Sequence, residues 1–333
     1  MKQIPILILV LMAGCGSQPE SRQDYNLAVP LLLQKETERT FRDVDFERVA
    51  RLEPPDSLLY PGGTQLLAEG VFLLEYTNKT VWRYDFDGRL VTTYGHGSGV
   101  GPREMQNPIG LSVVEDTVLI LDSTSRKVHR FTLDGMFLRS DQLPVQGIRI
   151  ATSAGTTLIH TFDSEEPFIL YPVRESRPIG PFFDGLGRLE GMKISGWLAA
   201  DHGRFVYVHN WLPFFGVLTA DNHFDLFDYA RATIDESTFI EPSLPEAQNG
   251  FRRFPPALNV HPSVTGDFLY MHSRIEDTDS SRVVDVYDLE AMGVYAYSFR
   301  IPFAARSMSF RGEMMSALTG PTTAALFRVR VRN

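Results

Sequence analysis

The chain has 333 residues, of which 43% are hydrophobic, and its formal net charge is −9. This apolar content is enough for a large buried core, while 26 glycines and 21 prolines indicate many turns. The acidic balance excludes the basic surface that holds a nucleic-acid backbone, so we expect no nucleic-acid partner.

Residues 1–14 have the layout of a secretory signal peptide. Lys2 supplies a positive charge, an apolar run extends from Ile4 to Met12, and the small residues Ala13 and Gly14 precede Cys15. The run is too short to cross a bilayer, which takes about 20 apolar residues.

The stretch from Leu11 to Cys15 resembles the lipobox of bacterial lipoproteins, with Met12 where leucine is usual. The resemblance implies cleavage before Cys15 and lipidation of its thiol. The mature protein would then be anchored to a membrane of the bacterial cell envelope, periplasmic or surface-facing. Cys15 is the only cysteine, which excludes an intramolecular disulfide and makes an anchor the simplest role for the thiol. The alternative is an ordinary exported protein with an accidental cysteine.

Residues 15–42 are polar and irregular, and we interpret them as the lipidated cysteine and a tether. Beyond them the sequence predicts short β-strands. Residues 70–95 are rich in Val, Leu, Phe, Tyr and Thr, and Asp87-Gly88 predicts a two-residue hairpin with a type I′ turn. The same order returns in 116–140, with Asp134-Gly135 at the turn. Weaker copies of the pattern occupy 156–173, 204–230 and 267–301.

A repeat of about 40 to 50 residues with four strands in each unit predicts a β-propeller. Residues 306–332 supply about three strands of a last unit, and 43–52 are expected to supply the fourth. We therefore predict an all-β, six-bladed β-propeller over 43–333, with four-stranded antiparallel blades. Closure of the ring by the N-terminal strand would remove exposed sheet edges.

The glycine-rich stretch GHGSGVGPREMQNP at 95–108 raises the possibility of a phosphate site. Its spacing matches neither the dinucleotide fingerprint nor the P-loop, and strands rather than a helix follow it. Instead it resembles the connection between blades in NHL-repeat propellers. The residues that carry this resemblance are Gly97, Gly99, Gly101, Pro102, Glu104 and Met105. Arg103 departs from the pattern, where glycine is common, and Met105 replaces phenylalanine.

Over residues 70–140 the chain is similar to six-bladed propeller lipoproteins of Bacteroidota-type bacteria, in the TolB-like group. Propellers of this kind include scaffolds, ligand binders and a few lyases or hydrolases, so the resemblance implies a fold and not a reaction. We expect a non-enzymatic binding or scaffolding module without a cofactor. Its partner would be a protein, peptide or glycan met on the loop-bearing face.

The alternative is a metal-dependent lyase or hydrolase. Alignment of the second strands places five polar residues at the same strand end: Glu75, Asp122, His160, His209 and His272. Gathered at one face, they could bind Zn²⁺ or Ca²⁺, or act as acid and base. Amidating lyases of similar fold use histidines in a central metal site. We favour the interpretation that each side chain caps the turn after its strand, and we expect no metal.

Four aromatic residues form a second candidate site: Trp197, Trp211, Phe214 and Phe215. They could present a stacking surface to a sugar or a peptide. Aromatic side chains also pack between propeller blades, and the sequence leaves both interpretations open.

Overall fold

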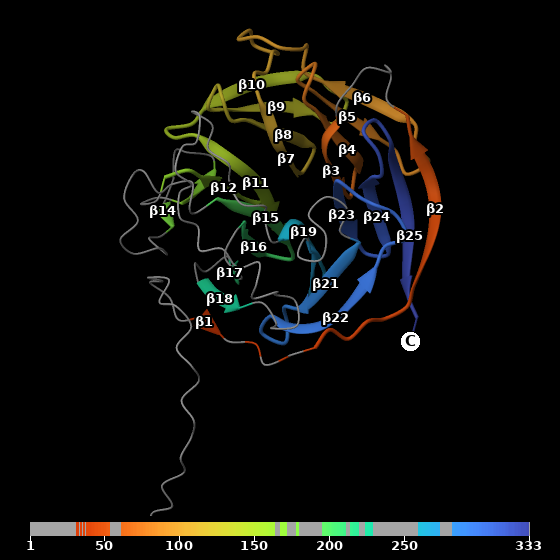
Figure 1. Ribbon diagram of the computed structural model, residues 1–333. Helices are drawn as coiled ribbons and strands as arrows, with labels where there is room; N and C mark the ends of the chain where they lie inside the picture. The colour runs from red at the N-terminus through yellow and green to blue at the C-terminus, as the bar shows by residue number, and fades with distance from the viewer. Residues whose placement is uncertain are drawn as a thin grey trace, which may run out of the picture.

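Six four-stranded antiparallel blades form a ring (Figure 1). Their inner strands line a central channel. This all-β six-bladed propeller is the architecture that the repeat predicts. The computed structural model describes residues 31–32, 34, 36, 38–53, 61–163, 167–171, 178–179, 195–210, 214–219, 224–228, 259–273 and 282–332.

We number the blades in chain order and give their strands from the channel outward. Blade 1 contains β3 (Pro61–Leu67), β4 (Gly70–Glu75), β5 (Thr80–Tyr84) and β6 (Leu90–Tyr94). Blade 2 contains β7 (Pro108–Val114), β8 (Thr117–Asp122), β9 (Lys127–Thr132) and β10 (Phe137–Gln142). Blade 3 contains β11 (Gly147–Ser153), β12 (Thr156–Thr161), β13 (Phe168–Tyr171) and β14 (Pro178–Ile179).

Blade 4 contains β15 (Gly196–Asp201), β16 (Arg204–His209), β17 (Phe214–Thr219) and β18 (Phe224–Asp228). Blade 5 contains β19 (Asn259–Thr265), β20 (Phe268–Ser273), β21 (Val283–Asp288) and β22 (Val294–Arg300). Blade 6 contains β23 (Ser307–Arg311), β24 (Met314–Leu318), β25 (Ala324–Val331) and, outermost, β2 (Val44–Leu52).

Blade 6 is assembled from the two ends of the described chain. β2 pairs antiparallel with β25, from Val44 opposite Val331 to Leu52 opposite Ala324. In Figure 1 the red-orange β2 lies along the blue β25. The N-terminal strand therefore closes the ring, as the sequence predicts.

The core consists of hydrophobic layers between adjacent blades. In β4, Val71 and Leu73 pack toward blade 6, while Phe72 and Leu74 pack toward blade 2. This alternation follows from the two-residue period of a strand, since both faces of a blade are covered by neighbours. Burying one such side chain contributes about 1.5–3 kcal/mol relative to leaving it exposed.

The two Asp-Gly hairpins differ from the predicted type I′ turn. At Asp87-Gly88 and Asp134-Gly135 only the glycines adopt positive φ, +83° and +94° respectively. The N–H of Gly88 donates to the carbonyl of Asp85 (3.1 Å), and β6 begins only at Leu90. The loops are therefore longer than two residues, with the left-handed glycine at the end of a hydrogen-bonded turn.

An N-terminal arm, residues 31–42, lies against the outer edges of blades 4 and 5 where it is described. Its β1 (Leu31–Leu32) pairs parallel with β18. Further along, the N–H of Ser298 in β22 donates to the carbonyl of Thr40 (2.8 Å). The arm then leads into β2, so one continuous segment contacts three successive blades (Figure 1).

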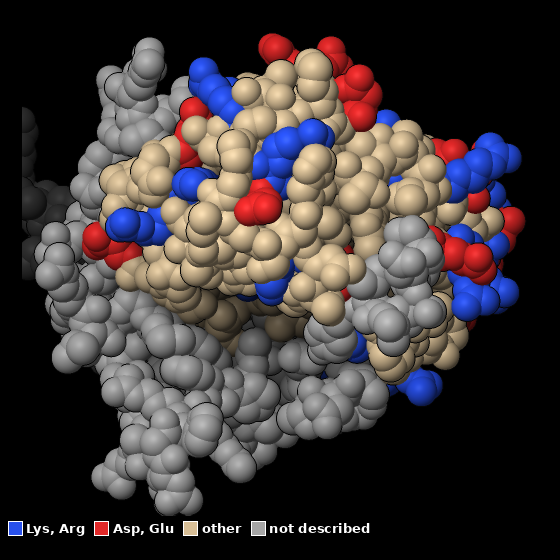
Figure 2. Space-filling model, turned by 90° about the horizontal axis from the view of Figure 1, so that it is seen from above, with Lys and Arg blue, Asp and Glu red and all other residues tan. Residues whose placement is uncertain are grey.

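Cys15 and the expected signal peptide lie outside the described residues. Within the described ranges, no helix has the length and apolar character that crossing a bilayer requires. Figure 2 shows one side of the ring, on which acidic and basic side chains are interspersed among uncharged residues.

Candidate functional site

The described connections between blades, 95–107, 143–146 and 301–306, lie at one face of the ring, which we call the connection face. Because neighbouring strands are antiparallel, each inner strand begins at this face and each second strand ends there. The opposite face carries the turns that join first to second and third to fourth strands, and we call it the turn face. Residues at the start of β11, β15 and β19 therefore lie near the connection face.

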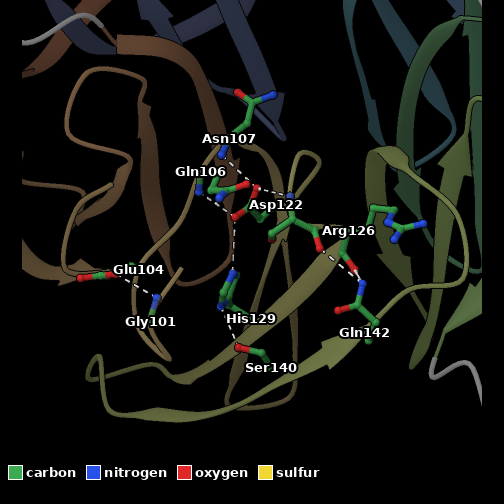
Figure 3. Close-up of polar contacts among 10 residues, drawn as sticks. Gly101, Glu104, Gln106, Asn107, Asp122, Arg126, His129, Ser140 and Gln142 are labelled. Atoms are coloured by element: carbon green, nitrogen blue, oxygen red, sulfur yellow. Dashed lines mark hydrogen bonds and ion pairs between the residues drawn. The ribbon is translucent and has the colours of Figure 1, made fainter. Parts of the chain in front are cut away.

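The glycine-rich connection is held by bonds within itself (Figure 3). Glu104 Oε2 accepts the N–H of Gly101 (2.8 Å), and the N–H of Met105 donates to the carbonyl of Gly97 (3.0 Å). Pro102 occupies the second position of a turn closed by the Glu104 N–H on the Gly101 carbonyl (3.1 Å). These backbone donors serve the loop itself, which supports a structural role and not a phosphate site.

Two of these glycines have specific reasons to be glycine. Gly97 has a φ of +103°, in the region that side chains disfavour. At Gly99 a Cβ atom would lie 2.0 Å from Glu104 Oε2. The connection therefore needs a residue without a side chain where the Glu104 carboxylate packs against its backbone.

The carboxylates of Asp122 and Glu75 both bind backbone N–H groups. Asp122 Oδ2 accepts from Gln106 (2.7 Å) and Oδ1 from Asn107 (2.9 Å), which ties the end of β8 to the connection before β7 (Figure 3). Glu75 accepts from the N–H of Thr77 (2.8 Å). Both side chains are fully buried and hold the chain at the ends of their strands.

Asp122, His129 and Ser140 have the residue types of an acyl-transfer triad. Ser140 Oγ lies 2.8 Å from His129 Nδ1, and His129 Nε2 lies 3.7 Å from Asp122 Oδ2 (Figure 3). However, His129 is only 1% exposed and does not line either of the two cavities described below. A nucleophile needs access to substrate as well as a base, so we assign this group to the stability of blade 2.

The pKa of Asp122 reflects the same arrangement. Burial alone would raise it, but His129 and the backbone N–H groups of Gln106 and Asn107 outweigh burial. They hold the pKa of Asp122 well below its usual value, because each of them favours the ionised carboxylate.

The three candidate histidines do not share one strand position. His209 pairs with the first residue of its inner strand, as Glu75 and Asp122 do. His160 and His272 lie one residue earlier, and the equivalent positions are Thr161 and Ser273. The sequence alignment was wrong by one residue in those two blades.

This shift turns the side chains to opposite sides of their blades, because successive residues of a strand alternate. His160 faces blade 4, where its ring lies 5.1 Å from Tyr207, and its Nδ1 lies 2.8 Å from the carbonyl of Pro167. Within the part of the chain that the structure describes, no three His, Cys, Asp or Glu side chains form a group suited to a metal ion.

The four candidate aromatic residues have different surroundings. Phe214 and Phe215 are fully buried in the layers between blades, so they cannot form a stacking surface. Trp211 lies outside the described residues. Trp197 is half-buried near the start of β15 and lines the central channel.

The channel holds a cavity of about 160 Å³ lined by the inner strands of all six blades. Near the connection face, four blades contribute aromatic or cationic side chains to its wall: Tyr76, Arg149, Trp197 and His261. We call these four residues the channel cluster. A second cavity, at the turn face, includes Phe86, His202 and Arg311 in its lining.

Arg149 and Trp197 are the central pair of the channel cluster. The guanidinium carbon of Arg149 lies 4.1 Å from the centre of the Trp197 ring, and the His261 ring lies 4.3 Å from it. Arg149 Nη1 donates to the carbonyl of Ile148 (2.6 Å). Burial lowers the pKa of Arg149, and Tyr76 partly opposes this effect.

Irregularities in strand pairing orient the side chains of the channel cluster. The strand register shifts between Gly147 and Arg149 and between Val260 and Ser263, and His261 has a φ of +52°. Such bulges redirect side chains at the ends of sheets and near binding sites. Tyr76 lies over Gly62, where a Cβ atom would come within 2.0 Å of its ring.

Sequence reasoning identified Trp197 but missed Arg149, His261 and Tyr76. The available signal was Arg149 within the apolar strand GIRIATS, because a charged residue in an inner strand is costly in the apolar layers between blades and is favoured beside the channel. Tyr76 follows Glu75 directly, but its position over Gly62 depends on the packing between strands.

No protein-family model matches the chain, and no curated protein matches it in sequence. Solved structures do match its fold. One, from Bacteroides fragilis and named as a candidate exported protein, has a TM-score of 0.59 at 12% identity, covering 91% of this chain and all of that one. A virginiamycin B lyase from Staphylococcus aureus, inactive and with quinupristin, gives 0.52 at 12% identity, covering 83% and 82%. The RRP9 WD40 repeats give 0.54 at 10% identity, covering 86% and 100%. These similarities establish the propeller fold.

Proposed function

We propose that this chain is a lipoprotein of the bacterial cell envelope, of the NHL-like and TolB-like kind, whose propeller is a non-enzymatic binding module. Its partner is a protein, peptide or glycan, and it binds at the connection face. Cys15 carries the lipid that holds the protein at the membrane.

The observation that carries this proposal is the channel cluster. Arg149, Trp197 and His261 come from three different blades and converge on one cavity. A cavity with apolar walls and a few convergent polar groups is the usual form of a binding site. The residue types also suit recognition, since tryptophan and arginine supply much of the binding energy at interfaces.

The enzymatic alternative has less support. A metal-dependent lyase or hydrolase would need its histidines gathered around one ion, with a position open to substrate. His160 and His209 are fully buried beside aromatic rings in the layer between blades 3 and 4, whereas His272 faces blade 6. Among the described residues no His, Cys, Asp or Glu group is suited to hold a metal ion. The fold similarity to a lyase does not transfer its reaction.

Binding can be tested with the detergent-solubilised full chain against panels of peptides and oligosaccharides. We expect at least one specific binder, with binding lost in Trp197→Ala because that ring holds Arg149 and His261 in place. The matched control is Phe86→Ala, which removes a 43% exposed ring at the turn face. Binding that depends on Phe86 and not on Trp197 would contradict the proposed face. Turnover of a binder that a chelator abolishes would favour the enzyme.

The anchor is tested separately by Cys15→Ala. If the thiol carries a lipid, the variant leaves the membrane fraction while the wild type stays there after a high-salt wash. A variant that remains with the membrane would show that something other than lipidation holds the protein.

A further inference from the structure

Two N–H donors of the channel cluster are buried without an acceptor. Arg149 Nε and Trp197 Nε1 make no hydrogen bond to the described part of the chain. Buried donors are nearly always paired, because leaving one unpaired loses its hydrogen bond to water without replacement. Two adjacent unpaired donors in one cavity wall indicate an acceptor that the described part of the chain does not supply.

The described residues also leave the charge of Arg149 uncompensated. Within the described ranges no carboxylate forms an ion pair with it, and its only described hydrogen bond is to the Ile148 carbonyl. Elsewhere the chain does pair a buried arginine, since Arg39 binds both oxygens of Asp285 at 3.0 Å. The missing acceptor at Arg149 should therefore carry a negative charge.

The surroundings of Trp197 further restrict which kind of ligand the cavity can bind. A tryptophan that stacks on a sugar needs a free ring face, whereas this ring is in contact with the Arg149 guanidinium and the His261 imidazole. Its indole N–H is therefore the group that remains available to bind a ligand, as a hydrogen-bond donor. Among the described residues that line the cavity, Arg149 is the only Lys or Arg near the connection face, while Arg311 lines it from the last residue of β23, toward the turn face. One positive charge suits a singly charged group better than a phosphate.

We infer that the channel cluster is a carboxylate-binding site, in which Arg149 and the Trp197 N–H donate to the two oxygens of one carboxylate. This inference rests on the proposed binding function and names the chemical group that is recognised. The planar guanidinium fork matches a carboxylate and gives short, charge-assisted bonds. Leu74 and Ile109 add apolar wall for the stem of the ligand.

The cavity sets the size of that stem. Its volume of about 160 Å³ is close to that of a cavity that accepts benzene, about 150 Å³. Benzoate is therefore a suitable probe, and benzamide is its neutral match with almost the same shape. A sugar acid is a second source of the same group, and galacturonate with galactose as its neutral match tests it.

The experiment measures binding of these four probes to the detergent-solubilised full chain by saturation-transfer NMR and calorimetry. We expect benzoate to bind at least tenfold more tightly than benzamide, because a charged acceptor strengthens the hydrogen bonds. Arg149→Met should abolish the preference for the acid. Trp197→Phe keeps a ring and removes only the N–H, so it should weaken benzoate about threefold to tenfold.

Arg311→Met is the matched control, because it removes an arginine from the turn-face end of the same channel. It should leave benzoate binding unchanged. Equal binding of benzoate and benzamide, no binding of either acid at millimolar concentration, or retention of the preference in Arg149→Met would overturn the inference. A partner whose binding depends on Trp197 would still support the proposed function in that case, so the two failures are distinguishable. Galacturonate binding in place of benzoate would support the inference and identify a sugar acid as the source.

Discussion

Blade 2 and the channel cluster both bury polar groups, but the Asp122 carboxylate of blade 2 is paired whereas two donors of the channel cluster are not. Asp122 receives two backbone N–H groups of the connection at 2.7 and 2.9 Å. In the channel, Arg149 Nε and Trp197 Nε1 have no described partner. Buried polar groups that hydrogen-bond to one another help to specify a fold, whereas unpaired buried groups lower the stability of the folded protein. The difference separates residues that hold the propeller together from residues available to a ligand.

The largest expected effect is at the paired Arg39, which fastens the N-terminal arm to blade 5. Arg39 is only 8% exposed and Asp285 is fully buried. Arg39→Met leaves the Asp285 carboxylate without its cation, so the free energy of unfolding should fall by about 3–5 kcal/mol. Chemical denaturation of both proteins measures the change.

The control for this pair is Arg328→Met, which breaks an exposed ion pair with Glu47. Such surface pairs contribute about 0–1 kcal/mol. If the two substitutions have equal effects, the arm is not held by Arg39.

The next effect is expected at Asp122. Asp122→Ala leaves the buried N–H groups of Gln106 and Asn107 without an acceptor. At about 1–3 kcal/mol for each unpaired group, the loss in unfolding free energy should reach several kcal/mol. Asp122→Asn keeps one oxygen acceptor and should lose less. An alanine variant as stable as the wild type would show that the carboxylate does not secure the connection.

The Asp122 contribution should also depend on pH. Its pKa is lower in the folded protein than in the unfolded chain, where it is about 3.9. Its stabilisation is therefore fully present above that value and is lost as the pH falls toward the folded pKa. The difference in unfolding free energy between wild type and Asp122→Asn should narrow from pH 7 to pH 3. A gap that widens on acidification would contradict the assignment.

The smallest effect is expected in the channel. Without ligand, Arg149→Met removes an uncompensated buried charge and loses one hydrogen bond and the contact with Trp197. These changes oppose each other, so the melting temperature should shift by no more than a few degrees. A loss as large as that of Arg39→Met would place Arg149 among the structural residues and remove the contrast between the two regions.

The sequence was informative where local pattern and repeat agree. The copies of the strand pattern predict six blades, and the shortfall of one strand in 306–332 correctly assigns 43–52 to the last blade. Hairpin positions were also correct, because Gly88 and Gly135 mark left-handed backbone. The turn type was wrong, since the Asp-Gly pair alone does not reveal that further residues belong to each loop.

The site was harder to predict because it depends on register. Strand ends looked equivalent at His160 and His209, but a shift of one residue sends the two side chains to opposite sides of their blades. The channel cluster also depends on bulges near Arg149 and His261, which no local pattern marks. Arg149 and Trp197 meet across two blades, and only the closed ring brings them together.

The pairing of β2 with β25 has a consequence for biosynthesis. Val44 meets Val331, so the seam joins segments separated by almost the whole described chain. The ring cannot close until the last strand has been synthesised and, for an exported chain, translocated. Contacts of such high sequence separation slow folding, although the entropy of the long loop grows only logarithmically with its length. Until then β2 has no partner strand and its edge stays open to other chains, which makes a chaperone useful throughout export rather than only at its start.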